Sequence, residues 1–180
     1  MQVNPRATDV VDPEGGAELV ALLADPARRV SPRARWWWLV RALLRAVVLL
    51  GLVAVWALVD DAHRGPQLVV GGVLAALTLG AAAVEPFWRY RVHRWDVTDT
   101  AVVTRSGWIT QGRRVAPVSR VQTVDVERGP IAGAFGLVSV RVTTASAHGP
   151  VDVEGLDAAT ADDLVARLTA VTARTPGDAT

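Results

Sequence analysis

The chain of 180 residues contains no cysteine. Disulfide bonds, thiolate nucleophiles and cysteine-ligated metal sites are therefore excluded, and the composition is compatible with a reducing compartment. Histidine is scarce: His63 lies in a predicted connector, His93 in a predicted strand and His148 in a predicted turn. No spacing unites them as metal ligands or as the base of a hydrolytic centre, so we expect each histidine on the surface.

The chain also lacks a strong excess of charge of either sign. Its formal net charge is only +1, which gives no reason to expect a nucleic-acid partner. The residues suggest no metal, no cofactor and no small-molecule substrate. Together with the scattered histidines, this predicts a protein that is not an enzyme.

Apolar residues, by contrast, are abundant and unevenly distributed. They make up 51% of the chain, and most of the excess lies between residues 39 and 84. Residues 1–32 form a polar leader without the basic start and apolar run of a secretory signal. We therefore expect the leader to be followed by a membrane-inserted segment rather than to direct export.

Two apolar segments, at residues 39–59 and 67–84, predict a transmembrane helical hairpin within residues 33–88. As helices they would be about 31 and 27 Å long, close to the roughly 30 Å of a hydrocarbon core. Arg41 and Arg45 lie in the first two turns of the first span, where their side chains can extend outward to the interface. The alternative, a soluble hairpin in a globular core, would need a polar face on each helix, and the sequence shows almost none.

Aromatic residues flank the two spans. Such rings prefer the headgroup layer of a bilayer, so we predict that they lie at the membrane interface together with the two arginines. The aromatic candidates are Trp36, Trp37, Trp38, Phe87 and Trp88.

Small residues recur every four positions in the second span, which would allow close approach to the first. General abundance of alanine and glycine explains the same pattern equally well. The residues concerned are Gly72, Ala76 and Gly80, opposite Gly51, Ala54 and Ala57.

The distribution of arginine predicts the orientation of the hairpin. The connector at residues 60–66 is short and acidic and has only Arg64, whereas arginines crowd the other ends of both spans. Those arginines are Arg28, Arg29, Arg33, Arg35, Arg41 and Arg45 around the first span, and Arg89, Arg91 and Arg94 after the second. By the positive-inside rule we expect a two-span protein of the cell membrane with both termini in the cytoplasm.

From residue 89 onward, polar and apolar residues alternate. The alternation and its turn signals predict short strands near residues 91–97, 101–109, 113–117, 121–128, 137–145 and 150–154, in an antiparallel β-sandwich or open barrel. Apolar residues at helical spacing from Ala161 to Val171 predict a C-terminal α-helix that covers the open end. The fold class is thus α+β, with this domain at residues 89–175 and a tail at 176–180.

Charged side chains on two of these strands have a structural interpretation. Asp125 and Glu127 share one face of their strand, and Arg141 is expected across the sheet. We interpret them as a solvated, ion-paired face rather than as a catalytic pair.

Three segments carry a family resemblance: RVSPRARWWW at residues 29–38, RYRVHRWDVTDTAVVTRSGWI at 89–109, and RRVAPVSRVQTVDVERGPIAGAFGLVSVRVTTA at 113–145. With the closing helix they resemble the bacterial pleckstrin-homology-like (PH-like) domain of YdbS-type membrane proteins. The third segment is the most specific, since it keeps residue type and spacing at Pro117, Arg120, Val121, Gln122, Phe135, Gly136, Leu137, Thr144 and Ala145. The alanine-rich loop at residues 129–134 departs from the family pattern.

The resemblance implies a two-helix membrane anchor with one cytoplasmic, seven-stranded PH-like domain and a C-terminal helix. It implies no enzymatic activity. Relatives often occur beside a larger protein with repeated copies of the domain, which implies a protein partner of the same kind.

Two groups of residues are candidates for contact with lipid or a partner. The first is basic and consists of Arg105, Arg113, Arg114 and Arg120. These could bind anionic headgroups, although ordinary solubility of strand edges explains them too. The second is the pair Ile131 and Phe135, which could dip into a membrane or a partner, although a phenylalanine in such a loop more often fills the core.

The sequence therefore leads to three functional hypotheses. The first is a membrane-anchored, non-enzymatic interaction or scaffolding module at the inner face of the membrane, with the bilayer and a protein as its partners. The second is sensing of anionic lipid by the arginine face. The third, transport by an oligomer of hairpins, lacks a mid-membrane polar group to line a pathway.

Overall fold

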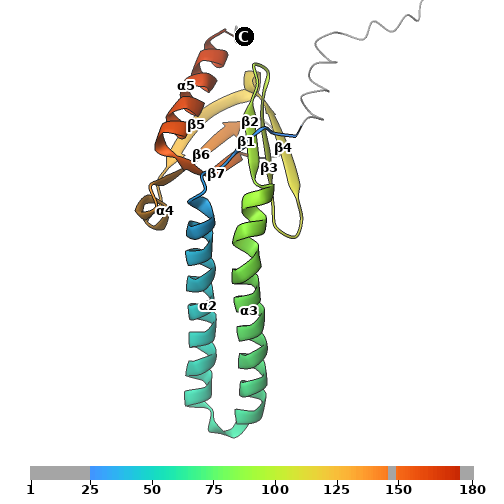
Figure 1. Ribbon diagram of the computed structural model, residues 1–180, viewed down its shortest axis with the longest axis vertical. Helices are drawn as coiled ribbons and strands as arrows, with labels where there is room; N and C mark the ends of the chain where they lie inside the picture. The colour runs from blue at the N-terminus through green and yellow to red at the C-terminus, as the bar shows by residue number, and fades with distance from the viewer. Residues whose placement is uncertain (1–24, 146–148, 175–180) are drawn as a thin grey trace, which may run out of the picture.

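A computed structural model describes residues 25–145 and 149–174 and shows a long helical hairpin with a β domain at one end (Figure 1). The hairpin consists of α2 (Ala34–Val59) and α3 (Arg64–Val92), joined by the 3-10 turn η1 (Asp61–His63). The predicted leader up to residue 24, the predicted tail at 176–180 and His148 lie outside the described residues.

The hairpin leaves its apolar side chains exposed. Both helices are long and apolar enough to cross a membrane, yet in the most apolar window of each only 11% of the residues are buried. Leu58 and Val59 are each 81% exposed. A helix in a soluble core buries such side chains, so the exposure favours the predicted pair of spans over the soluble alternative.

The two helices pack through small side chains, but not through the predicted stripe. Gly72 and Gly80 have open space where a side chain would be, whereas a Cβ added to Gly71 would lie 3.2 Å from Cγ1 of Val53. The contact face of α3 is therefore one residue away from the predicted one. A four-residue recurrence gives the spacing of small residues but does not show which of two adjacent stripes meets the neighbouring helix.

The β domain consists of two antiparallel sheets. Sheet A has the strand order β1-β2-β3-β4 and sheet B the order β5-β6-β7. The strands are β1 (Arg28–Arg29), β2 (Arg94–Val97), β3 (Ala101–Ser106), β4 (Gly112–Pro117), β5 (Val121–Glu127), β6 (Leu137–Thr144) and β7 (Val151–Asp157). The turn η2 (Val118–Arg120) leads from sheet A to sheet B, and the short helix α4 (Pro130–Ala134) joins β5 to β6. The described part of the chain thus confirms the predicted antiparallel architecture.

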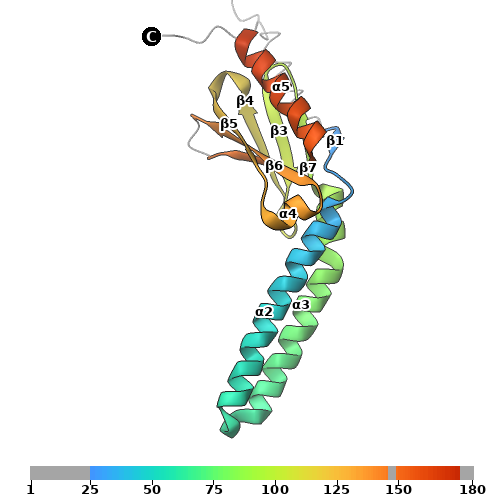
Figure 2. The ribbon, with the colours of Figure 1, turned by 90° about the vertical axis from the view of Figure 1, so that its left-hand side faces the viewer.

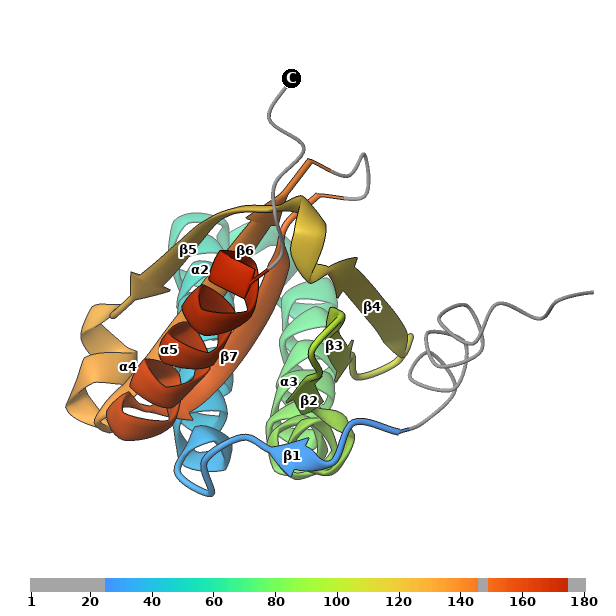
Figure 3. The same ribbon diagram turned by 90° about the horizontal axis from the view of Figure 1, so that it is seen from above.

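The C-terminal helix α5 (Ala158–Arg174) closes the domain, as predicted. It contacts strands of both sheets, and Figure 3 shows it lying across them on the side away from the hairpin. Its residues Ala161, Leu164 and Leu168 are buried in the common core. The apolar stripe read from the sequence is therefore the face that covers the sheets.

The domain begins before the hairpin, which moves the predicted boundaries at residues 32 and 89. Strand β1 pairs with β2, and Val30 is buried in the core. The hairpin is therefore inserted between the first two strands of one domain. A strand of two residues is too short to show an alternating pattern, so no local pattern predicts it.

Helix α3 continues through Pro86 as far as Val92. The strand predicted at residues 91–97 consequently starts only at Arg94. Pro86 cannot donate a backbone hydrogen bond within the helix, but it is buried against the rest of the protein. Packing along the hairpin thus outweighs the terminating signal of proline.

The start of the hairpin lies inside the β domain. Ala34, Trp37 and Trp38 belong to the same buried cluster as the apolar residues of both sheets. The Ser31 backbone N–H donates to the Gly155 carbonyl oxygen at 2.9 Å, and a Cβ added to Gly155 would lie 2.8 Å from the Ala34 Cβ. We call this contact between the start of α2 and strand β7 the seat of the domain.

The seat corrects the prediction that all three consecutive tryptophans face the headgroup layer. Trp37 and Trp38 are only 7% and 2% exposed, and their rings stack with centroids 6.0 Å apart. The prediction fails for these two because the β domain folds over the first turns of α2, which local composition cannot reveal. Trp36 remains exposed.

His93 is buried, contrary to the prediction that it lies on the surface. It is 2% exposed, its ring centroid lies 5.7 Å from that of Trp38, and neither ring nitrogen has a hydrogen-bond partner. Burial, and to a lesser degree the charge of Arg89, lowers the pKa of His93 to about 4. The imidazole is therefore neutral at physiological pH, whereas His63 is exposed beside Asp60, as predicted.

Because Gly155 packs tightly against Ala34, adding a single methyl group at Gly155 should lower the stability of the protein. The φ of Gly155 is +76°, so in Gly155→Ala the left-handed backbone costs about 1–2 kcal/mol, and Ala34 must also move. We expect a lower thermal unfolding midpoint for the full-length variant in detergent. Gly112→Ala is the matched control because a Cβ at Gly112 meets nothing within 4 Å. Equal midpoints for the two variants would contradict the tight seat.

The burial of His93 predicts acid sensitivity. Because its pKa is lower in the folded than in the unfolded chain, the unfolded chain binds more protons between pH 6.5 and about 4, and stability falls as the pH drops through this window. Between pH 7 and pH 5 we expect a loss of about 2 kcal/mol in the free energy of unfolding from this residue. Denaturant titrations at both pH values should show a smaller loss for His93→Phe, and an unchanged loss would refute the assignment.

Candidate functional site: charged surfaces above the hairpin

Three predicted interface aromatics surround the end of the hairpin next to the β domain. Trp36, Phe87 and Trp88 are 47%, 44% and 46% exposed. The rings of Trp36 and Phe87 meet edge to face with centroids 6.4 Å apart. These three residues have the exposure that contact with lipid headgroups requires.

The two arginines of the first span have partners that the sequence did not indicate. The Arg41 guanidinium lies 5.1 Å from the centroid of the Trp37 ring. Arg45 forms an ion pair of 3.0 Å with Glu85 of α3, whose side chain is only 14% exposed. A paired arginine costs less at a membrane boundary than a lone one, so the pair helps Arg45 to lie in the hairpin.

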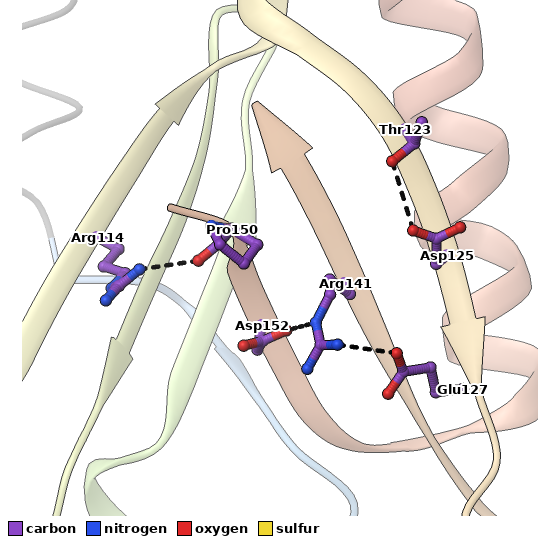
Figure 4. Close-up of polar contacts among 7 residues, drawn as sticks. All are labelled: Arg114, Thr123, Asp125, Glu127, Arg141, Pro150 and Asp152. Carbon is purple, nitrogen blue, oxygen red and sulfur yellow. Dashed lines mark hydrogen bonds and ion pairs between the residues drawn. The ribbon is translucent and has the colours of Figure 1, made fainter. Parts of the chain in front are cut away.

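The four predicted contact arginines do not form a single patch. Arg105 and Arg113 lie opposite each other on β3 and β4. Arg114 points to the other side of β4 and donates to the Pro150 carbonyl oxygen at 2.8 Å (Figure 4). Arg120 lies in η2, at the opposite end of β4. The four arginines are close in sequence, but the pleat of β4 turns Arg114 to the opposite face and Arg120 lies in the turn that follows the strand.

Two further arginines, which sequence reasoning missed at this face, accompany Arg105 and Arg113. Arg94 of β2 lies opposite Arg105, and Arg29 of β1 lies opposite Arg94. The Arg105 guanidinium also binds Asp25 and the Gln111 side-chain oxygen, at 2.9 and 2.8 Å. Only the register of the strands brings these arginines together, and a single sequence does not give that register.

The two apolar candidates lie at α4. Ile131 and Phe135 are half-buried and pack against the main core. Ile131 also lines a hollow of about 310 Å³ between α4 and the start of α2, where Trp37 and Arg41 form part of the wall. Phe135 therefore fills the edge of the core, while Ile131 is partly accessible from the side that faces the hairpin.

The outer face of sheet B carries the predicted ion-paired network. Arg141 donates to Asp152 at 2.7 Å and to Glu127 at 3.0 Å, as Figure 4 shows. The hydrogen bond to Asp152, together with the charges of the neighbouring carboxylates, raises the pKa of Arg141 above its usual value. Asp125 lies opposite Arg141 in the register and accepts a bond from Thr123. The arrangement is that of a solvated salt-bridge network, as the sequence predicted.

A polar cavity of about 600 Å³ lies between the end of α3 and the two sheets. Three carboxylates line it, and each has an arginine partner: Glu85 binds Arg45, Glu154 binds Arg89 at 2.9 Å, and Asp152 binds Arg141. His93 and Thr104, both buried, form part of its wall. The charges are thus engaged in structural pairs.

Histidine and acidic side chains of the described residues are spread over the hairpin and the domain. Within residues 25–145 and 149–174, no group of three or more histidine or acidic side chains is arranged to hold a metal ion. His93 is the buried titratable group of the cavity, and its ring nitrogens contact no hydroxyl nucleophile. The features that stand out are charged surfaces and an exposed aromatic belt.

Comparison with known proteins agrees with this arrangement. The sequence model of the family described as "Bacterial PH domain" matches residues 39–172. The chain is also similar to the UPF0699 transmembrane protein YdbS of Bacillus subtilis (strain 168), with 30% identity over 152 residues, which cover 82% of this chain and 95% of the relative. No solved structure matches the chain significantly.

Three observations lead to one conclusion: two apolar helices have exposed side chains, a helix closes two antiparallel sheets, and the family match covers both parts. The chain belongs to the bacterial PH domain family and is a membrane protein that carries such a domain on a helical hairpin.

Proposed function

We propose that this protein is a membrane-anchored, non-enzymatic interaction module that holds its PH domain at the inner face of the cell membrane. The observation that carries the proposal is the seat, because the start of α2 is buried in the core of the domain and Tyr90, near the end of α3, packs against the same core. A domain held in this way presents its surfaces at a fixed height and tilt above the bilayer. That geometry suits a docking platform better than a freely tethered binding domain.

The orientation of the platform follows from charge. Arginines surround the end of the hairpin that carries the domain, whereas the connector contributes Asp60 and Asp61 against Arg64. Positive residues favour the cytoplasmic side of a membrane. We therefore place the PH domain and both termini in the cytoplasm.

The absence of cysteine gives a direct test of this orientation. A single cysteine at Ala62→Cys, in the connector, should react with a membrane-impermeant maleimide in intact bacterial cells. A single cysteine at Ala173→Cys, on the exposed face of α5, should react only after permeabilisation. The reverse pattern would invert the proposed topology, and labelling of both in intact cells would contradict a sealed hairpin.

The open edge of sheet B is the surface that best fits a protein partner. Strand β5 ends the sheet and spans seven residues, most of them exposed. Such an edge can accept a strand from another protein through backbone hydrogen bonds. A second membrane protein with PH-like domains would offer strands at the same height above the bilayer, so we propose a partner of this class.

Site-specific photocrosslinking in cells tests the partner surface. A photoreactive residue at Gln122 or Val126, both exposed on β5, should crosslink the full-length protein to another PH-domain protein identified by mass spectrometry. The same residue at Arg167, exposed on α5, is the control. Equal yields at all three positions, or adducts without a PH domain, would count against edge pairing.

The second candidate function is recognition of anionic lipid. The set of four arginines predicted from the sequence does not support it as one patch, since Arg114 and Arg120 point elsewhere. Arg105 and Arg113 do support it, because they lie together on a face of sheet A near the hairpin.

A further inference from the structure

The strand register aligns four arginines across the whole of sheet A. Arg29 lies opposite Arg94, Arg94 opposite Arg105, and Arg105 opposite Arg113. Residues directly opposite each other on antiparallel strands point to the same face, with Cβ atoms about 5 Å apart. These four residues form what we call the arginine row, which extends for about 14 Å across the four strands.

The arginine row lies on the outer face of the sheet. Its chain neighbours Trp95 and Thr104 are 1% and 2% exposed and point into the domain, and side chains alternate along a strand. Asp96 shares the outer face, and Asp25 binds Arg105 at 2.9 and 3.1 Å. Among the residues that the structure describes, the four arginines of the row share this face with these two aspartates.

The row lies close to the place where the hairpin leaves the domain. Helix α3 ends at Val92, four residues beyond the exposed Trp88 and a rise of about 6 Å, and Arg94 begins β2 two residues later. The headgroup layer is about 5–8 Å thick, so an extended arginine side chain can reach into it from this height. Figures 1 and 2 show the turn between β3 and β4 reaching back beside the upper part of α3, and at its tip Ile109 is 85% exposed.

We propose that the arginine row and the β3–β4 turn form a binding site for the anionic phospholipid headgroups of the leaflet next to the domain. A guanidinium group presents a planar fork of donors that matches phosphate oxygens, and Ile109 adds an apolar contact at the interface. Like charges directly opposite each other destabilise a sheet, and anionic headgroups relieve that repulsion. The inference rests on the proposed position of the domain at the bilayer surface.

The test uses the full-length protein in vesicles of phosphatidylcholine and phosphatidylglycerol. A single cysteine at Thr110→Cys, exposed beside Ile109, carries a fluorophore. A nitroxide near the top of the acyl chain, on either phosphatidylglycerol or phosphatidylcholine, quenches this fluorophore, and the quenching by the two labelled lipids is compared. The ratio of the two association constants measures selectivity for anionic lipid next to the turn.

We expect clear selectivity for phosphatidylglycerol in the otherwise unchanged chain. In Arg29→Gln/Arg94→Gln the ratio of the two association constants should fall by about 30-fold, because each arginine near an anionic surface contributes roughly 1 kcal/mol. In the control Arg167→Gln/Arg174→Gln, on α5, the ratio should stay unchanged. The selectivity should also vanish when the salt concentration rises from about 0.1 to about 1 M, where screening shortens the Debye length from about 10 to about 3 Å.

Several outcomes would overturn the proposal. Equal quenching of the unchanged chain by the two lipids at low salt would overturn it. This outcome needs no variant, so it remains decisive even if Arg29→Gln/Arg94→Gln does not fold. Equal selectivity in folded Arg29→Gln/Arg94→Gln and in the unchanged chain, or selectivity that survives at about 1 M salt, would also overturn the proposal, because the charges of the row would then not be its source. Because both leaflets of the vesicles have the same composition, the result does not depend on the orientation tested by cysteine labelling in cells.

Discussion

The contact between the first turn of α2 and strand β7 constrains everything that lies above the membrane. Gly155 leaves no room for a side chain against Ala34, and Trp38 fills the space beside the end of α3. No flexible linker separates the domain from its anchor, because His93 alone stands between α3 and β2. The tilt of the two helices in the bilayer therefore sets the tilt of both sheets.

A chain of ion pairs continues this rigid connection from the hairpin to the sheets. Arg45 and Glu85 join the two helices, and Arg89 of α3 binds Glu154 of β7 while lying 4.7 Å from the Trp38 ring centroid. Isolated exposed pairs contribute little to stability, but partly buried pairs in a network fix geometry. The polar cavity beside α3 is thus lined by charged groups that also hold the junction together.

The sequence predicts the parts of this fold whose signal is local. Span length, alternation in β5 and β6, and the apolar stripe of α5 each follow from residues close together in the chain. What it could not predict depends on contacts between distant segments. The burial of Trp37, Trp38 and His93 arises because β7 folds back over the ends of the hairpin. The arginine row likewise depends on the pairing of β1, only two residues long, with a strand that follows the entire hairpin.

The insertion of the hairpin between β1 and β2 separates the two surfaces to which we assign lipid contact and protein contact. It brings Arg29 and Arg94, which lie on either side of the membrane-spanning segment in the sequence, next to each other at the base of sheet A. Sheet B continues from sheet A through η2 and ends at the open strand β5. The proposed lipid contact through the arginine row and the proposed pairing with a protein through β5 would therefore use separate surfaces. Since the seat fixes both surfaces relative to the bilayer, headgroups bound at the row would hold the open edge in one orientation for its partner.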